Sequence, residues 1–226
     1  PRCRGRGWVS PNVPFNHPQR YELKPCVCQA ETFNQQRIDR AWFPAGPAKT
    51  FANFEPVPGT EEAVALSHQW IARETSANVL TLAGPNGCGK SHLTEAIGRA
   101  MVAAGVSTRY AYAPDLLHEI RSTFHDESSD PDAMLEHYRR FGVLLIDDLG
   151  AINPTAWGVK TLSEMMDYRY RSGLLMVVAV NRSMTEIAKM MDPDIADRLW
   201  DARSGRTLVA RITAPSYRTD ETWVRS

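Results

Sequence analysis

Five short apolar runs recur along the chain, between segments whose apolar residues have helical spacing. Val79–Ala83 and Val143–Ile146 contain almost no polar residue, and a third run spans Leu174–Val180. Short runs of this kind are typical of strands that are buried on both faces, as in a parallel sheet. Two further runs, Thr108–Ala113 and Leu208–Ile212, complete a predicted sheet of five parallel strands.

The segments between these runs predict helices. Thr60 is placed to cap a helix whose first turn holds two glutamates. A second helix contains Leu93, Ile97 and Met101 on one face. Residues 125–133 are acidic and contain serine and proline, which predicts an exposed loop. Alternating strands and helices indicate an α/β fold. The other predicted helices cover the ranges 116–124, 134–141 and 155–171.

A glycine-rich loop joins the first apolar run to the helix that follows it. Residues 84–91 read Gly-Pro-Asn-Gly-Cys-Gly-Lys-Ser, which matches the pattern Gly-x-x-x-x-Gly-Lys-Ser. Glycines let the backbone turn without a Cβ, so that the loop N–H groups and the helix N-terminus face a phosphate. In such a loop Lys90 reaches the β- and γ-phosphates of a nucleotide and Ser91 holds Mg²⁺. The predicted nucleotide-binding residues are Gly84, Pro85, Asn86, Gly87, Cys88, Gly89, Lys90, Ser91 and His92.

Two aspartates follow the apolar run at 143–146. In nucleotide-binding folds with a glycine loop, an acid at the end of such a strand lies beside that loop. Asp147 is therefore predicted to hold Mg²⁺, directly or through water, and Asp148 to orient or deprotonate the attacking water. The alternative is a strand that ends at a solvated acidic turn, and the glycine loop earlier in the chain argues against it.

Three more polar residues, Asn181, Arg198 and Arg218, are candidates to contact a γ-phosphate. Asn181 comes directly after the run at 174–180, where its amide would hydrogen-bond the γ-phosphate or the attacking water. Arg198 falls on a short helix, and Arg218 lies near the C-terminus in Ser216-Tyr217-Arg218. A guanidinium suits a γ-phosphate because its charge is fixed and its donors are forked. Taken singly, a turn asparagine and solvated arginines are the simpler interpretations.

In this order the motifs resemble the DnaC/IstB group of AAA+ ATPases. The resemblance covers roughly residues 50–219. It includes Thr50-Phe51-Ala52-Asn53-Phe54, which is similar to the Phe-x-x-Phe entry of that domain, and Asp-Asp-Leu-Gly at 147–150. It implies a P-loop AAA+ (ASCE) fold with helices flanking the sheet. Only eight residues follow Arg218, so no C-terminal lid domain is expected. Residues 114–141 match the place where the initiator clade carries a helical insertion.

The resemblance also implies catalytic roles. Asn181 matches the sensor-1 residue, and Arg198 matches the arginine finger that reaches the ATP of a neighbouring subunit. Arg218 matches a sensor-2-type arginine. Asp148 stands where many AAA+ proteins carry glutamate, and its side chain is one methylene shorter, which predicts slow turnover. The predicted catalytic residues of this ATP hydrolase are Asp148, Asn181, Arg198 and Arg218.

Charge is unevenly distributed along the 226 residues. The chain has 26 basic and 26 acidic side chains, which argues against a wholly basic DNA-binding surface. Residues 1–49 nevertheless carry a net charge of +5, so residues 50–226 carry −5. No apolar run approaches the roughly 18–20 residues of a membrane span and no signal peptide is visible, so a cytoplasmic protein is expected. The chain begins at Pro1 rather than methionine, which suggests that residues precede it.

Three of the four cysteines lie in the basic segment. Cys3-Arg4-Gly5-Arg6-Gly7 resembles the second half of a Cys-x-x-Cys-x-Gly-x-Gly zinc knuckle, and Cys26-Val27-Cys28 would close the site. Structural zinc takes four ligands. The fourth is expected to be a cysteine directly before Pro1, with His17 as the fallback. Free thiols are the alternative, and a disulfide is disfavoured in the cytoplasm.

The composition divides the chain into three parts. Residues 1–35 are predicted to form the zinc-knuckle-like module. Residues 36–59 form a linker in which prolines and glycines discourage regular structure. Residues 60–226 form the AAA+ ATPase domain.

By resemblance, the favoured function is loading a replicative hexameric helicase onto single-stranded DNA. ATP binding would drive assembly of a homo-oligomer and hydrolysis would drive release, with ATP, Mg²⁺ and Zn²⁺ as cofactors and no membrane partner. An IstB-like ATPase that regulates DNA transposition is the alternative, and the N-terminal module favours the loader, which needs a part that contacts the helicase. A metabolic P-loop kinase would need an acceptor site and a phosphate-clamping lid, and the sequence offers a candidate for neither.

Overall fold

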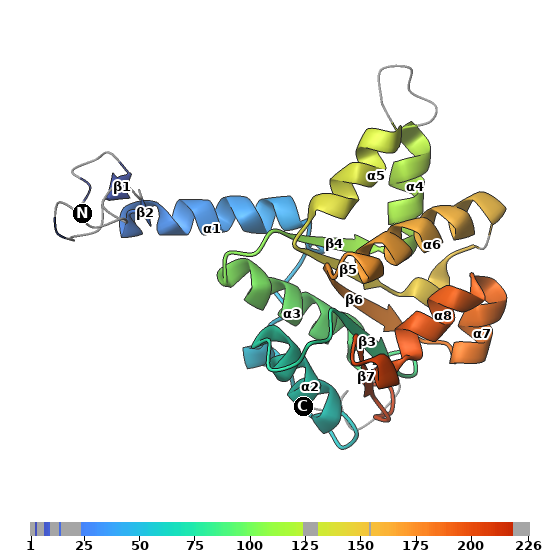
Figure 1. Ribbon diagram of the computed structural model, residues 1–226. Coiled ribbons are helices and arrows are strands. Elements are labelled where there is room, and N and C mark those ends of the chain that lie inside the picture. Colours follow the sequence, from blue (N-terminus) through green and yellow to red (C-terminus); the bar gives the residue numbers. More distant parts are fainter. Residues whose placement is uncertain are drawn as a thin grey trace.

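Five parallel strands form the central sheet of the computed structural model, which describes residues 3, 7–9, 14, 24–123, 131–153 and 155–218 (Figure 1). The order across the sheet is β4-β5-β6-β3-β7. The α/β fold with a five-stranded parallel sheet is confirmed, and each strand lies within one residue of its predicted range. In chain order the strands are β3 (Val79–Ala83), β4 (Thr108–Tyr112), β5 (Val143–Asp147), β6 (Leu175–Val180) and β7 (Thr207–Arg211).

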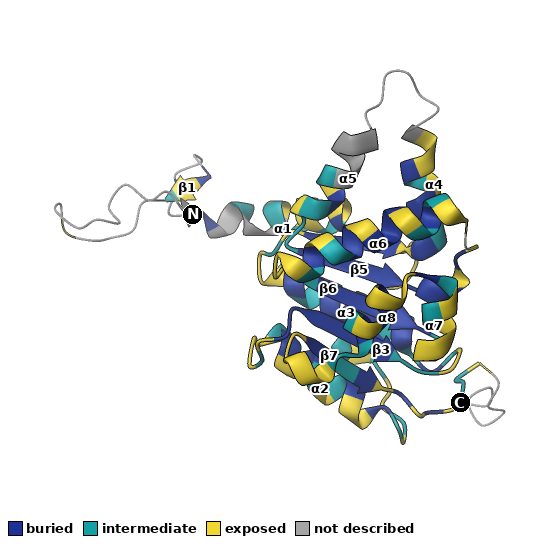
Figure 2. Ribbon diagram, turned by 45° about the vertical axis from the view of Figure 1, so that its right-hand side comes forward, coloured by how far each residue is buried: buried dark blue, intermediate teal, exposed yellow. Residues whose placement is uncertain are grey.

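Helices cover both faces of this sheet, and Figure 2 shows its strands buried between them. Alternate strand residues enter two separate hydrophobic clusters, so that Leu80 and Leu145 face one layer while Val79 and Leu144 face the other. One layer contains α2 (Glu61–Ile71) and α3 (Lys90–Ala103). The other contains α4 (Ala113–Thr123), α5 (Pro131–Arg140), α6 (Ala156–Arg171), α7 (Met184–Met190) and α8 (Pro193–Trp200). Short 3-10 turns are η2 (Phe51–Asn53), η3 (Leu149–Ala151) and η4 (Ala202–Ser204).

A helix that the sequence pattern did not predict, α1 (Val27–Ala41), extends from the body of the molecule (Figure 1). It packs against α3 and β4 and ends at Trp42, whose φ of 55° is left-handed. It crosses the predicted boundary at residue 35, so the expectation of irregular structure is wrong for residues 36–41. The reason is composition, because the prolines and glycines of the predicted linker begin only at Pro44.

A small antiparallel pair lies at the far end of α1 (Figure 1). It consists of β1 (Trp8–Val9) and β2 (Lys24–Pro25), and the Cys26 N–H donates to the Gly7 carbonyl over 2.8 Å. Both Cys3 and Cys26 are buried. The pairing therefore brings the segment around Gly7 against the start of α1.

Thr60 precedes α2 as predicted, but its side chain does not cap the helix. Its hydroxyl donates to the Val57 carbonyl over 2.7 Å and accepts from the Val57 N–H over 3.1 Å. Glu61 instead turns back and accepts from the Gly59 N–H over 2.8 Å. The threonine therefore closes the turn that leads into the helix.

Candidate nucleotide-binding site

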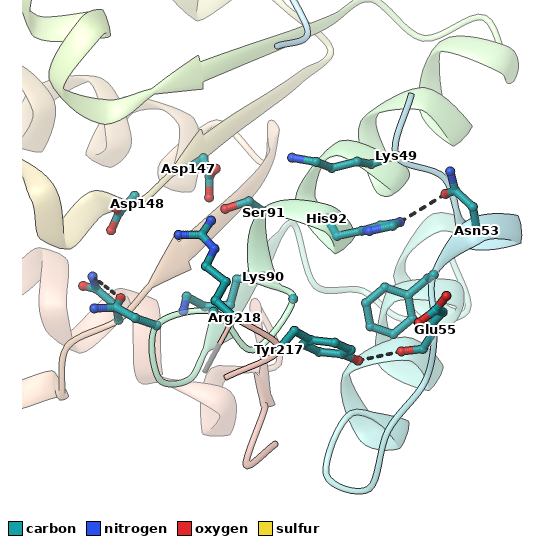
Figure 3. Close-up of a pocket in the computed structure, with 15 residues that line it drawn as sticks. Lys49, Asn53, Glu55, Lys90, Ser91, His92, Asp147, Asp148, Tyr217 and Arg218 are labelled. Carbon is teal, nitrogen blue, oxygen red and sulfur yellow. Dashed lines mark hydrogen bonds between the residues drawn. The ribbon is translucent and has the colours of Figure 1, made fainter. Parts of the chain in front are cut away.

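A cleft of about 540 Å³ opens at the carboxyl ends of the central strands (Figure 3). Ligand sites in parallel sheets occur at this edge because the loops that leave the strands meet there. Most of the residues predicted from the motifs line this cleft together. The lining residues are Lys49, Asn53, Phe54, Glu55, Asn86, Gly87, Gly89, Lys90, Ser91, His92, Asp147, Asp148, Asn181, Tyr217 and Arg218.

The glycine loop is shaped by two different requirements. Gly87 and Gly89 have φ angles of 78° and 97°, in the left-handed region that favours glycine. Gly84 has ordinary backbone angles, but a Cβ there would lie 2.6 Å from the Ile212 carbonyl oxygen. A Cβ on Gly87 would also lie 2.1 Å from Ser216 Oγ. The loop is therefore packed against the segment that follows β7, a contact that the motif alone did not predict.

Lys90 begins α3 and is buried, with 7% of its surface exposed. Its Nζ donates to the carbonyls of Gly84 and Pro85 over 2.9 and 2.6 Å. Cys88 is fully buried beneath the loop, with its Sγ 3.8 Å from the same Nζ. Backbone carbonyls thus hold the ammonium inside the loop, at the wall of the cleft.

Asp147 ends β5 with two oxygens in different surroundings. Oδ2 accepts a hydrogen bond from the Tyr110 hydroxyl over 2.5 Å. Oδ1 is buried and has no hydrogen-bond partner in the described part of the chain. Figure 3 shows the carboxylate pointing toward Ser91. Buried polar atoms rarely lack a partner, and oxygen ligands are what Mg²⁺ prefers. The pair Asp147 and Ser91 therefore fits Mg²⁺ carried with a nucleotide.

Asp148 follows in a left-handed conformation, with φ of 52°, and lines the same cleft. Burial raises the pKa of its carboxyl and the charge of Asp147 raises it further, whereas Lys90 and Arg182 act in the opposite direction. A carboxylate is a better proton acceptor when its pKa lies closer to the working pH. The environment of Asp148 is therefore suited to the predicted role of activating water.

Tyr110 is a site residue that the motifs did not reveal. It lies on β4, and burial, followed by the charge of Asp147, raises the pKa of its hydroxyl. The hydroxyl therefore stays protonated and can donate to the carboxylate. Its only sequence signal is a tyrosine within a predicted strand, which packing explains equally well.

An aromatic wall of Phe54, His92 and Tyr217 lines the cleft beside the glycine loop, where a Cβ on Gly89 would lie 3.1 Å from the Phe54 ring. The rings of Phe54 and His92 meet edge to face at 5.1 Å, and His92 Nε2 lies 3.0 Å from the Thr50 carbonyl. Tyr217 donates from its hydroxyl to the Glu55 carbonyl over 2.5 Å. Aromatic walls of this kind suit the planar base of a nucleotide. Of these residues, only His92 was predicted as nucleotide-binding.

Asn181 and Arg218 both line the cleft, and they come from different elements. Asn181 Nδ2 donates to Asn86 Oδ1 over 2.9 Å, which links the tip of β6 to the glycine loop. Arg218 points into the cleft toward Ser91 (Figure 3). Both predicted residues therefore line the same cleft as the glycine loop.

Arg198 lies outside the cleft. It is on α8, where its guanidinium forms an ion pair with Asp167 of α6 and lies 5.3 Å from the centre of the Tyr170 ring. Arg198 is therefore not among the residues that line the nucleotide cleft of its own chain. Of the predicted catalytic residues, the structure brings Asp148, Asn181 and Arg218 together and leaves Arg198 apart.

The predicted zinc site has no support in the described residues. Among them, no group of three His, Cys, Asp or Glu side chains comes together to hold a metal ion. The side chain of Cys28 and all of His17 lie outside the described residues. None of the described helices is long and apolar enough to cross a membrane.

Comparison with known proteins agrees with the cleft and the sheet. Residues 57–223 match the family model of the IstB-like ATP binding protein. The chain is 29% identical over 147 residues to the putative ATP-binding protein of insertion sequence IS232 from Bacillus thuringiensis subsp. berliner, covering 64% of this chain and 57% of that protein. It is 24% identical over 190 residues to the replicative helicase loader DnaC of Escherichia coli (strain K12), covering 83% and 74%. The chain thus spans little more than half of the insertion-sequence protein.

A solved structure shares the fold. The crystal structure of the DnaC helicase loader superposes with a TM-score of 0.64 at 19% identity, covering 74% of this chain and 97% of that chain. The family model covers most of the chain, including the glycine loop, both aspartates, Asn181 and Arg218. The chain therefore belongs to the family of IstB-like ATP-binding proteins, and is an AAA+ ATPase of the DnaC/IstB type.

Proposed function

We propose that the protein is an ATP-dependent loader that places a replicative hexameric helicase on single-stranded DNA. ATP binding would drive assembly into a homo-oligomer, and hydrolysis would drive release of the partner. The cleft carries the nucleotide part of this proposal. Oδ1 of Asp147 has no hydrogen-bond partner among the described residues, and Asp147 lines the same cleft as the loop that holds the buried cation of Lys90.

The residues of the cleft divide the work of hydrolysis. Mg²⁺ bound with the nucleotide would neutralise charge that develops on the phosphates. Lys90 would exchange the loop carbonyls for phosphate oxygens, and Asn181 would exchange Asn86 for the γ-phosphate. Asp148 would hold the attacking water and take its proton, while Arg218 would stabilise the phosphate charge.

The separate position of Arg198 supports an oligomeric enzyme. It lies on the face formed by α7 and α8 rather than in its own cleft. An arginine supplied by a neighbouring subunit completes the charge stabilisation of such sites in trans. ATP would then favour assembly, because only the assembled protein has a complete site.

The N-terminal unit, which comprises the β1–β2 pair and the start of α1, supports the loader over the transposition ATPase. The β1–β2 pair lies at the far end of α1, away from the central sheet, where a protein partner would reach it (Figure 1). DnaC of Escherichia coli is described as a replicative helicase loader. The family match and the IS232 relative favour the alternative, an ATPase that regulates DNA transposition.

A pull-down with the replicative helicase of the source organism separates these functions. The full chain should retain the helicase in the presence of ATP and Mg²⁺, and the Lys90→Ala variant should retain much less. Failure of the wild-type protein to bind helicase, together with ATP-dependent filaments on duplex DNA, would favour the transposition ATPase.

Zinc in the N-terminal unit is a separate part of the proposal. Cys3 and Cys26 are two buried thiols, and Cys26 directly follows β2, the strand that pairs with β1. Metal analysis of the full-length protein should find close to one zinc per chain. A content below about half an equivalent would leave too little metal for a structural site and would rule it out.

A further inference from the structure

Tyr110 reaches the nucleotide site from a buried position on strand β4 rather than from a loop. The strand register pairs it with Leu145, two residues before Asp147 on the neighbouring strand. Its side chain leans along the sheet so that its hydroxyl reaches Asp147 Oδ2 at 2.5 Å. The ring is 6% exposed and packs with Phe43, whose ring centre is 6.2 Å away. The hydroxyl is therefore held in place by packing on one side and a carboxylate on the other.

This hydrogen bond makes the two oxygens of Asp147 unequal. Rotation about the last bond of an aspartate side chain has a broad, shallow profile, so packing alone does not determine which oxygen faces the cleft. With Tyr110 bound to Oδ2, the remaining Oδ1 is the buried atom without a hydrogen-bond partner in the described part of the chain. The tyrosine thus leaves one defined oxygen for a cation.

Packing alone would not require a hydroxyl here. The cluster around Tyr110 is apolar, with Leu93, Val143 and Leu145 among its buried members. A hydroxyl buried in apolar surroundings is unfavourable unless it is hydrogen-bonded, and phenylalanine would fill the same space. The hydroxyl of Tyr110 is therefore explained by its hydrogen bond to Asp147 at the cleft.

We propose that Tyr110 is the positioning residue for the carboxylate that holds Mg²⁺, so that it sets the affinity of the site for Mg²⁺ without touching the nucleotide. This inference rests on the proposed function, in which Asp147 serves the Mg²⁺ of a bound nucleotide. Metal-ligating carboxylates are themselves commonly hydrogen-bonded, and loss of such a partner typically costs about 10–100-fold in metal affinity or activity.

The test is a Mg²⁺ titration of nucleotide binding with Tyr110→Phe, which removes only the hydroxyl. Binding of a non-hydrolysable ATP analogue is measured in EDTA and then at rising Mg²⁺ concentration. Tyr110→Phe should bind the analogue in EDTA like the wild-type protein. The Mg²⁺ concentration that gives half of the full increase in affinity should rise about 10–100-fold.

Two other tyrosines provide matched controls. Tyr112→Phe makes the same change two residues along the same strand, at an exposed side chain. Tyr138→Phe removes a buried hydroxyl that donates to Glu119 over 2.6 Å, away from the cleft. Both variants should keep the wild-type Mg²⁺ midpoint, and Tyr138→Phe reports what the loss of a buried hydroxyl does to folding alone.

The outcomes separate this inference from the proposed function. A wild-type protein whose nucleotide binding does not respond to Mg²⁺ would contradict the role of Asp147. A wild-type response that Tyr110→Phe leaves unchanged, or equal weakening with and without Mg²⁺, would overturn the role of Tyr110. If Tyr110→Phe does not fold, the titration is made with 4-fluorophenylalanine at position 110, which fills part of the space of the hydroxyl but cannot donate a hydrogen bond. An unchanged Mg²⁺ midpoint in that protein would equally overturn the inference.

Discussion

Two buried cations, Lys90 and Arg169, are held in the same way in two different places. Lys90 donates to two backbone carbonyls of the glycine loop. Arg169 of α6 is completely buried and also donates to backbone carbonyls, at the end of α5, before β5 and in β6. The accepting residues are Tyr138, Arg139, Phe141, Gly142 and Leu175.

The difference between the two sites is what lies on their other side. Lys90 lines an open cleft beside Asp147 and Asp148, so another ligand can replace its carbonyls. Arg169 is enclosed on every side, and burial lowers its pKa to about 10, which leaves it charged near neutral pH. Hydrogen bonds from a cation to backbone carbonyls therefore hold Lys90 where a ligand can bind it. The same kind of bond from Arg169 joins α6 to α5, to the segment before β5 and to β6. Substitutions of five cations test whether the surroundings of the carbonyls decide the cost of losing a cation. They are ranked below by the expected loss in the free energy of unfolding.

Arg169→Met should have the largest effect on stability. Methionine fills much of the space, but it leaves several enclosed carbonyls at the end of α5 without a donor. Each buried unsatisfied group costs about 1–3 kcal/mol, so a loss of roughly 3–4 kcal/mol is expected after partial relaxation. Urea unfolding of the nucleotide-free protein measures it. Nucleotide affinity of the folded fraction should not change.

Arg171→Met is the matched control for Arg169. It lies two residues along the same helix, with a largely exposed side chain paired to Asp167. Exposed pairs contribute about 0–1 kcal/mol, so the variant should stay near the wild-type midpoint. A loss at Arg169 no larger than the loss at Arg171 would show that enclosure of the carbonyls is not important.

Lys90→Ala should have a smaller effect on stability and a complete effect on function. The carbonyls of Gly84 and Pro85 lie beside an open cleft, where water can replace the lost donor, so the expected loss is below about 1 kcal/mol. A ligand that binds only the native state stabilises it, by about 2.7 kcal/mol at a concentration of 100 times its Kd. Wild-type protein should show such a gain in MgATP and Lys90→Ala none. A retained gain would contradict the assignment of the loop.

The contrast also shows which features sequence can predict. Lys90 was predicted because its role depends on the six residues before it and on Ser91 after it, which together form one motif. Arg169 appears in the sequence as one of several charges on an amphipathic helix, and its burial depends on carbonyls 27–31 residues away. Tyr110 and the aromatic wall were missed for the same reason. The strands were predicted from local apolar runs, whereas their order and the packing of residues 212–217 on the loop arise only in the folded chain.

Arg198→Ala extends the comparison to a partly exposed cation with a carboxylate partner. Its side chain is 29% exposed and pairs with Asp167, so the free energy of unfolding should fall by about 0.5 kcal/mol. ATP binding should remain, but hydrolysis by the assembled protein should fall about 10³-fold or more if the arginine acts in trans. Steady-state phosphate release measures this.

Mixing two inactive variants makes the test of Arg198 specific. Arg198→Ala supplies an intact cleft and Lys90→Ala supplies an intact arginine, so mixed assemblies should recover part of the hydrolysis. Wild-type hydrolysis by Arg198→Ala alone, in a protein shown to be oligomeric, would rule out its role as the finger.

Lys160→Ala should have the smallest effect and gives the series its baseline. The side chain on α6 is 76% exposed, and its only ion pair among the described residues is with Glu164, four residues on, at 3.8 Å. Such exposed helical pairs contribute about 0.3–0.5 kcal/mol and are screened by salt, so any loss in urea should shrink at high ionic strength. The variant removes the same single positive charge as Lys90→Ala, but touches neither the cleft nor an enclosed carbonyl. A loss in the free energy of unfolding above about 1 kcal/mol for Lys160→Ala would mean that the change in net charge dominates the stability effects. The effects at Lys90 and Arg169 would then have to be attributed to charge rather than to the surroundings of their carbonyls.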